Sequence, residues 1–262
     1  MGPRGRFVEL FSSAQGEGPH VGASTLFVRL GGCDLRCRWC DSPHTWRPPA
    51  TCRIETARGS GAFRELPNPV AADEVVAAAE ALELDAHRFV ALTGGEPLLQ
   101  PEVVGGLARA LGKRGPRVLL ETAGHLPDAL ETVVESIDVV SMDWKLASDV
   151  RREGEPAAVL QEAGRSFDEL HARFLAVARR APEWYVKIVV TEASRDTEVL
   201  AACERIAEQD PTTLVVLQPV TPTGVVRERP AAARLLALQR AASRWLVDLR
   251  VIPQTHPLYG AP

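Results

Sequence analysis

The sequence predicts an α/β fold, a partial (β6/α-type) modified TIM barrel with mainly parallel strands, as a single domain over residues 1–262. Two observations predict it. Apolar strand-like segments alternate with amphipathic helical segments through most of the chain, which is typical of parallel sheets with right-handed crossovers. About six such units are present, fewer than the eight of a complete barrel.

The N-terminal part begins with two expected strands, Arg6–Ser12 and Thr25–Leu30, the second rich in β-branched and aromatic residues. A stretch rich in Cys, Pro and Arg follows, from Gly31 to about Pro69. Its Pro48-Pro49 and Gly59–Gly61 clusters are incompatible with a continuous helix or strand. We therefore expect a long loop with an insertion at about 46–68, serving as a lid, a reductase-docking surface or a disordered loop.

The remainder alternates regularly. An early Pro and an acidic first turn mark the first of these helices. The expected helices are Pro69–Leu84, Pro101–Lys113, Pro127–Ser136, Ser166–Arg180, Asp196–Gln209 and Pro230–Trp245. The expected strands are Arg88–Thr93, Arg117–Thr122, Asp138–Asp143, Trp184–Thr191, Thr212–Gln218 and Leu246–Ile252. Most of these strands are followed by polar residues, and this end of a parallel sheet is where such folds place their sites.

The composition narrows the class of protein. Hydrophobic residues make up 45% and charged residues 24%, as in globular proteins. The apolar runs fall well short of the ~20 residues that a membrane-spanning helix needs, and the N-terminus has no signal-peptide pattern. The formal net charge of −4 gives no footprint for nucleic acid. We expect a cytoplasmic protein that binds neither nucleic acid nor a membrane.

Three of the five cysteines form a C-x3-C-x2-C loop, and the other two, Cys52 and Cys203, are expected to be incidental thiols. The triad can bind three irons of a 4Fe-4S cluster and leave the fourth iron open to a ligand. A zinc site completed by His44 is the alternative. The three ligands are Cys33, Cys37 and Cys40.

Two motifs together resemble the radical S-adenosylmethionine (SAM) superfamily. The triad contains an aromatic residue, Trp39, before its last cysteine, and Thr93-Gly-Gly-Glu-Pro97 looks like the superfamily's GGEP motif. The resemblance implies a 4Fe-4S cluster whose open iron binds SAM, which is then cleaved to a 5′-deoxyadenosyl radical. Glycines at a strand end also allow backbone to approach a ligand closely.

Further stretches resemble the 7-carboxy-7-deazaguanine synthase family of queuosine and deazapurine biosynthesis. They are Gln15-Gly-Glu-Gly18, Phe27-Val-Arg29, Cys40-Asp-Ser42 and Gln254-Thr-His256. The resemblance covers nearly the whole chain and is weakest over Pro48–Asn68 and Ser148–Gln161. It implies a lyase that converts 6-carboxy-5,6,7,8-tetrahydropterin to 7-carboxy-7-deazaguanine by radical ring contraction with loss of ammonia. SAM is then a regenerated cofactor, and Mg2+ assists.

The resemblance also implies the residues of the site. Arg29 would bind the substrate carboxylate through its planar fork, and the hydroxyl of Ser42 would bind Mg2+. The implied substrate contacts are Ala14, Gln15, Gly16, Glu17, Arg29, Thr93, Gln254, His256 and Pro262. The implied SAM contacts are Trp39, Gly94, Gly95, Glu96, Ser141, Asp143, Lys145, Lys187 and Gln218.

Lys145 and Lys187 are two of only three lysines among 30 basic residues, which suggests that a guanidinium does not serve there. In the region of Ser141, Asp143 and Lys145 the spacing S-M-D-W-K is longer than the family's S-P-K. The individual roles of these three residues therefore stay open. An external electron donor of flavodoxin or ferredoxin type and a homodimer are implied partners.

Two other functions compete with this interpretation. A glycyl-radical-enzyme activase would share the triad and GGEP, but it leaves Gln15–Gly18, Arg29 and Gln254–His256 unexplained. A zinc-binding structural or interaction module, or a degenerate family member without chemistry, belongs to a different class. The sequence does not decide whether the product would enter transfer-RNA queuosine or a secondary metabolite.

Overall fold

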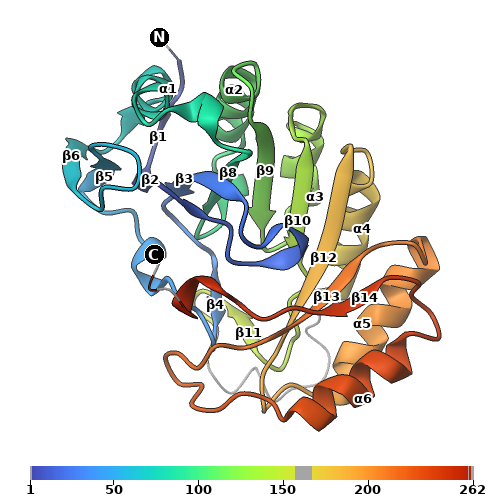
Figure 1. Ribbon diagram of the computed structural model, residues 1–262. Helices are drawn as coiled ribbons and strands as arrows, with labels where there is room; N and C mark the ends of the chain where they lie inside the picture. Colours follow the sequence, from blue (N-terminus) through green and yellow to red (C-terminus); the bar gives the residue numbers. More distant parts are fainter. Residues whose placement is uncertain (1, 157–166, 259, 261–262) are drawn as a thin grey trace.

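A ten-stranded sheet organises the computed structural model, which describes residues 2–156, 167–258 and 260 (Figure 1). From one edge its order is β14-β13-β12-β10-β9-β8-β3-β2-β5-β6. The described strands from β14 to β3 are all parallel to their neighbours, and β2 runs antiparallel to β3. The parallel strands are β3 (Ser24–Leu30), β8 (Phe89–Gly94), β9 (Arg117–Thr122), β10 (Val139–Asp143), β12 (Glu183–Val190), β13 (Val215–Pro219) and β14 (Leu249–Val251).

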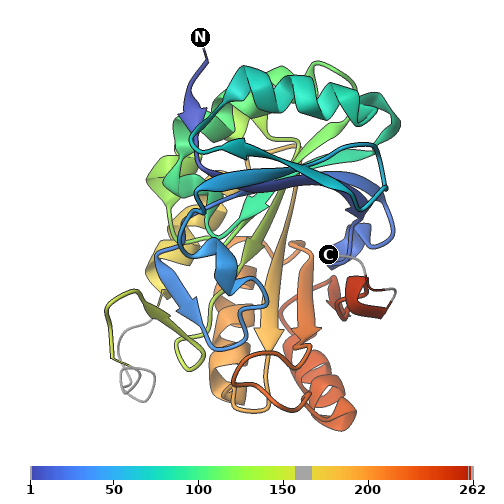
Figure 2. The ribbon, with the colours of Figure 1, turned by 90° about the vertical axis from the view of Figure 1, so that its left-hand side faces the viewer.

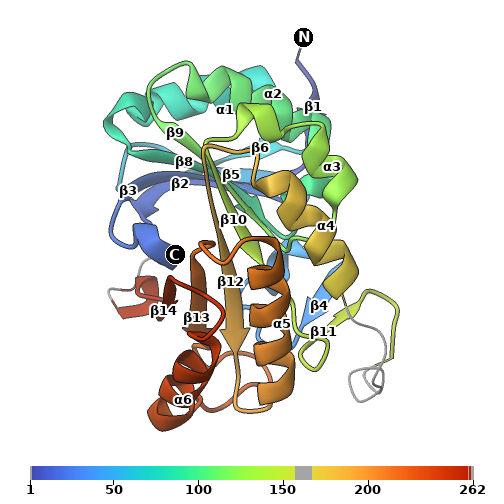
Figure 3. The same ribbon diagram turned by 90° about the vertical axis from the view of Figure 1, so that its right-hand side faces the viewer.

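The helices cover the outer face of this curved sheet (Figures 1 and 3). The main apolar core lies between the helices and that face, with residues such as Leu107, Phe174 and Val140 fully buried. The helices are α1 (Ala72–Ala81), α2 (Pro101–Gly112), α3 (Pro127–Glu131), α4 (Asp168–Ala178), α5 (Asp196–Gln209) and α6 (Ala232–Ala242). The predicted partial barrel with mainly parallel strands is confirmed. None of the helices in the described residues is long and apolar enough to cross a membrane.

The inner face of the sheet changes character along each strand. Phe89, Leu119, Val139 and Tyr185 form a smaller buried cluster near the beginnings of their strands. Because side chains two residues apart share a face, the same inner face continues toward the strand ends with the polar residues Glu121, Asp143 and Lys187. The inner face is therefore closed by apolar side chains at one end and is polar at the other.

The predicted loop at 46–68 is wrong, because the segment forms a hairpin. Strands β5 (Thr51–Glu55) and β6 (Phe63–Pro67) pair with each other, and β5 extends the sheet beside β2 (Phe7–Ala14). The prolines precede β5 and the glycines lie in the turn, so these residues bound the strands and do not interrupt them. The carboxylate of Glu55 accepts the backbone N–H groups of Ser12 (2.9 Å) and Gly61 (3.0 Å), which fastens the hairpin to β2.

Several short elements were not predicted. β4 (Leu35–Cys37), within the cysteine loop, pairs antiparallel with β11 (Val150–Arg152), and β1 (Arg4–Gly5) pairs with β7 (Val70–Ala71). The predicted helix Pro127–Ser136 is split into α3 and a single 3-10 turn, Val134–Ser136. Figures 1 and 2 show that the segment after β3 and the C-terminal segment both lie on the side of the sheet away from the helices.

Candidate active site

A cavity of about 500 Å3 opens at the polar end of the inner face. This volume is typical of a small-molecule site. Most residues predicted from the sequence line it: Ala14, Gln15, Gly16, Glu17, Arg29, Cys33, Cys37, Trp39, Cys40, Ser42, Thr93, Gly94, Gly95, Asp143, Lys145, Lys187, Gln218, Gln254 and His256. Residues from both ends of the chain therefore meet at one cavity. Pro262 lies outside the described residues.

The cysteine loop forms one wall of the cavity and is held from behind. Its Cys33 N–H donates to the carbonyl of Trp46 (3.3 Å), and the N–H of Arg38 donates to the carbonyl of Asp149 (2.9 Å). The Asp149 carboxylate is buried and accepts hydrogen bonds from the hydroxyls of Ser194 (2.6 Å) and Thr191 (3.1 Å). The segment before β11 thus fixes the position of the loop between its second and third cysteines.

The three thiols of the triad line the cavity, and their donor set is that of an iron–sulfur cluster with one open iron. Burial raises the pKa of Cys33 to about 11 and that of Cys37 to about 12. A bound metal would therefore be needed to keep both as thiolates at neutral pH. Among the described residues, no three His, Cys, Asp or Glu side chains converge closely enough to hold one metal ion. A cubane distributes its ligands over separate irons, so the triad fits the cluster.

The Gly94-Gly95 pair brings the end of β8 against the cysteine loop. Gly94 has φ +138°, and a Cβ there would lie 2.0 Å from the carbonyl oxygen of Leu30. A Cβ on Gly95 would lie 2.3 Å from the carbonyl oxygen of Gly32 and 2.8 Å from the Cβ of Cys33. Only glycine allows this approach, so strand end and cysteine loop form one continuous wall.

Two predicted SAM contacts do not line the cavity. Glu96 is fully buried beneath it and accepts hydrogen bonds from the Leu98 N–H (3.0 Å), the Thr122 hydroxyl (2.8 Å) and the Ala123 N–H (2.8 Å). It therefore holds the turn that follows β9. Ser141 lies two residues before Asp143 on the same face of β10, one layer further from the cavity.

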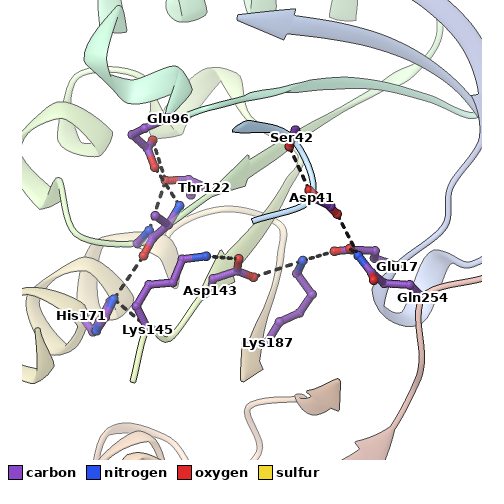
Figure 4. A network of polar contacts seen from close by, with 12 residues as sticks. Glu17, Asp41, Ser42, Glu96, Thr122, Asp143, Lys145, His171, Lys187 and Gln254 are labelled. Carbon is purple, nitrogen blue, oxygen red and sulfur yellow. Dashed lines mark hydrogen bonds and ion pairs between the residues drawn. The ribbon is translucent and has the colours of Figure 1, made fainter. Parts of the chain in front are cut away.

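A chain of charged side chains crosses the cavity floor (Figure 4). Asp143 lies between two lysines, 2.6 Å from Lys145 Nζ and 3.1 Å from Lys187 Nζ. Lys187 also pairs with Glu17, whose other oxygen accepts a hydrogen bond from Gln254 Nε2 at 2.6 Å. The Lys145 ammonium lies 4.3 Å from the ring centre of Trp39, so a cation–π contact links this floor to the cysteine loop.

These pairs fix the charges of the floor. Burial alone would favour a neutral Asp143, but Lys145 and Lys187 lower its pKa to about 2. In return, and again against burial, Asp143 raises the pKa of both lysines. The floor therefore presents two ammonium groups held by the carboxylate of Asp143. Burial alone would raise the pKa of Glu17, but Lys187 lowers it, so Glu17 is ionised as well.

The C-terminal segment forms part of the cavity wall on the side of the sheet away from the helices (Figure 1). Gln254 also donates to Asp41 (3.1 Å), whose other oxygen accepts from the Ser42 hydroxyl (2.9 Å). The N–H of Thr255 donates to the carbonyl of Gly16 (2.9 Å). The segment thus joins the loop that follows β2 to the residues that follow the cysteine triad.

Sequence reasoning missed several residues of the wall. Glu121 accepts a hydrogen bond from the Gln15 side chain at 2.8 Å, and Glu9 accepts from Arg29 Nε at 3.0 Å. Arg53, on β5, reaches the same cavity. A charged residue inside an otherwise apolar strand was the available signal for Glu9 and Glu121. Arg53 carried no such signal, because its segment is predicted to be a loop and not a strand.

Comparison with known proteins gives consistent matches. The sequence model of the Radical SAM superfamily matches residues 27–181. The chain is 36% identical to the 7-carboxy-7-deazaguanine synthase of Geobacter sulfurreducens, with 98% of each chain covered. It is 33% identical to that of Methanothermobacter thermautotrophicus, again with 98% of each covered. The crystal structure of QueE from Escherichia coli superposes with a TM-score of 0.62 and 22% identity, covering 97% of this chain and 95% of that one.

Proposed function

This chain belongs to the 7-carboxy-7-deazaguanine synthase family, within the radical SAM superfamily, and we propose that it performs the reaction named by that family. The substrate is 6-carboxy-5,6,7,8-tetrahydropterin, the product is 7-carboxy-7-deazaguanine, and ammonia leaves as the ring contracts. The observation that carries the proposal is a single cavity lined by the cysteine triad, the Gly94-Gly95 turn and an ordered set of charges.

The cofactors would occupy the wall and floor already described. Cys33, Cys37 and Cys40 would hold the 4Fe-4S cluster, and Gly94-Gly95 with the Trp39–Lys145 pair would border SAM. When bound, the cluster and SAM supply the 5′-deoxyadenosyl radical that abstracts a hydrogen atom from the substrate.

The chain's own residues would orient the pterin. Gln15, Glu17 and Glu121 offer acceptors at one side of the cavity, suited to the N–H groups of the aminopyrimidinone edge. Arg29 would bind the carboxylate from the other side, and Ser42 would offer an oxygen to Mg2+. Thr93, Gln254 and His256 would complete the wall, whereas the roles of Pro262, Glu96 and Ser141 in binding stay predictions.

We extend the proposal to the setting of the reaction. The enzyme would act in the cytoplasm as a homodimer of single-domain subunits and would take its electron from a flavodoxin or ferredoxin. A radical SAM enzyme acting on a small molecule needs such an external reductant.

An anaerobic assay tests the proposal. Reconstituted protein is mixed with SAM, a reductant, Mg2+ and carboxytetrahydropterin, and the products are read by mass spectrometry. We expect carboxydeazaguanine in excess over SAM consumed. 5′-Deoxyadenosine without that product would favour the activase alternative. A colourless protein that binds one zinc per chain would favour the structural module.

The cysteine assignments have a matched control. Cys37→Ala should lose iron and sulfide after reconstitution, whereas Cys203→Ala, at a buried position of helix α5 away from the cavity, should retain both. Equal iron content in the two variants would overturn the assignment of the triad.

A further inference from the structure

We propose that Arg53, from the hairpin β5–β6, is a second arginine for the carboxylate of the substrate, acting beside Arg29. The inference rests on the proposed function, since it names a binding residue for the same substrate. Arg53 lies on β5, in the stretch where the resemblance of the sequence to the family is weakest.

The register of three neighbouring strands places Arg53 at the cavity. In the sheet, Glu9 on β2 is the direct partner of Arg29 on β3 and of Arg53 on β5. Partners in register point to the same face of a sheet. All three side chains line the cavity. The hairpin that was predicted to be a loop therefore extends the wall of the site by one charged residue.

The charges of this group do not cancel. The side chain of Glu9 is 9% exposed, and one oxygen of its carboxylate accepts a hydrogen bond from Arg29 Nε at 3.0 Å. Its other oxygen lies 3.6 Å from Arg53 Nη1, an ion-pair distance rather than a hydrogen bond. Two guanidinium groups share one carboxylate, which leaves one positive charge and Nη donors for an anion. A planar carboxylate is the ligand that such forks bind best.

Arg53 is held in position and is not a freely moving surface side chain. Its guanidinium lies 4.1 Å from the ring centre of Phe63 on β6, within the range of a cation–π contact. The other hairpin arginine that forms an ion pair, Arg58, points elsewhere and binds Glu83 at 3.1 Å. Phe63 is therefore a positioning residue for Arg53.

The order of strands identifies the anion as the substrate's. Among the residues that line the cavity, one row of partners runs from Arg53 through Glu9 and Arg29 to Thr93, next to β9, which carries Glu121. Glu65, the partner of Arg53 on β6, does not line the cavity. The lining is therefore positive at its β5 end and acidic at its β9 end. A carboxypterin has the same polarity, with a carboxylate at one end and N–H donors at the other. The lysines assigned to SAM lie beyond Glu121, on β12 and after β10.

Calorimetric titration of the reconstituted holoenzyme with SAM and Mg2+ tests the inference. The probes are oxidised 6-carboxypterin and unsubstituted pterin, neither of which is turned over. Because Arg53 is half-exposed and screened by water, we expect Arg53→Gln to raise the Kd of carboxypterin about 3- to 10-fold. The Kd of pterin should not change.

Three further variants sharpen the test. Arg58→Gln, the matched control in the same hairpin, should leave both constants unchanged. Arg53→Lys keeps the charge without the fork and should give a smaller loss. Phe63→Leu should weaken carboxypterin binding while Arg53 is still present.

The contrary results distinguish a failure of the role of Arg53 from a failure of the proposed function. An unchanged Kd in Arg53→Gln, an equal loss for both pterins, or a loss for SAM alone would overturn the role of Arg53 and leave the proposed function intact. If the wild-type protein binds neither pterin and forms no product, the proposed function fails and the inference with it.

Discussion

Replacing Asp143 by asparagine tests the charged floor of the cavity most directly. The change keeps the size of the side chain but removes the carboxylate that lies between Lys145 and Lys187. Lys187 retains Glu17, whereas Lys145 retains only its contact with Trp39 among the described residues and the influence of the nearby Cys37 thiol. A buried ammonium without its partner is strongly unfavourable, so the variant should be less stable than the wild type.

The magnitude follows from the pKa of Asp143. The two lysines lower it from 3.8 to about 2, which corresponds to about 2.5 kcal/mol in favour of the folded, ionised state. The folded-state pKa is depressed, so this contribution is complete above pH ~4 and is lost as the pH falls toward 2. An asparagine side chain does not titrate, so Asp143→Asn should cost about 2.5 kcal/mol at pH 7 and progressively less below pH ~4.

Urea unfolding of the protein without its cluster, between pH 7 and pH 3, measures the effect. Asp149→Asn is the matched control, because burial raises the pKa of Asp149 and its partners are hydroxyls rather than cations. We expect the control to cost clearly less at pH 7. Adding Lys145→Met to Asp143→Asn should restore part of the lost stability. Equal costs for the two asparagine variants, or a cost independent of pH, would refute the reasoning.

Three other predictions concern close contacts and burial. Gly95→Ala should reduce iron loading, because the added Cβ would lie 2.3 Å from the carbonyl oxygen of Gly32. Gly106→Ala is the control and should load normally, because its added Cβ would have no neighbour nearer than 3.4 Å. The iron content of the reconstituted proteins measures both effects. Gly16→Ala would bring a Cβ to 2.4 Å from the ring of His256, so faster proteolysis of the C-terminal segment is expected, and an unchanged rate would contradict that packing. Burial lowers the pKa of His171 to about 3, so wild-type stability should fall as pH drops below ~6.5, and His171→Gln should flatten that slope in urea titrations.

The parts of the fold that followed from the sequence are those governed by local periodicity. The sequence of Val139–Asp143 predicts a strand because it is mostly apolar before Asp143. In the structure Asp143 ends this strand and lines the cavity, as expected for a polar residue at a strand end. The hairpin β5–β6 was missed for a local reason as well. Pro and Gly clusters mark boundaries, and a pattern alone does not tell whether they interrupt a strand or bound it.

Interactions across the barrel could not be predicted, because they depend on the register of distant strands. The contact between Gln254 and Glu17 joins residues 237 positions apart. The surroundings of Glu96 could not be predicted either: the motif places it beside SAM, and in the structure its carboxylate is buried and accepts hydrogen bonds from three donors. A motif fixes which residue types are present, whereas burial decides which of them a ligand can reach.

The charges of the cavity wall explain why so many ionised groups can lie together in a small volume. Five carboxylates and four lysine or arginine side chains line it, and most of them are paired with one another. A ligand that carried only one charge would leave some of these partners unpaired, which is costly in a buried site. SAM and a carboxypterin each bring an anionic group together with cationic or N–H groups, so each can exchange partners with the wall without leaving a net charge behind. This balance favours ligands of mixed polarity, and it places the carboxylate of the pterin where the cations outnumber the carboxylates, at Arg29 and Arg53, which share Glu9.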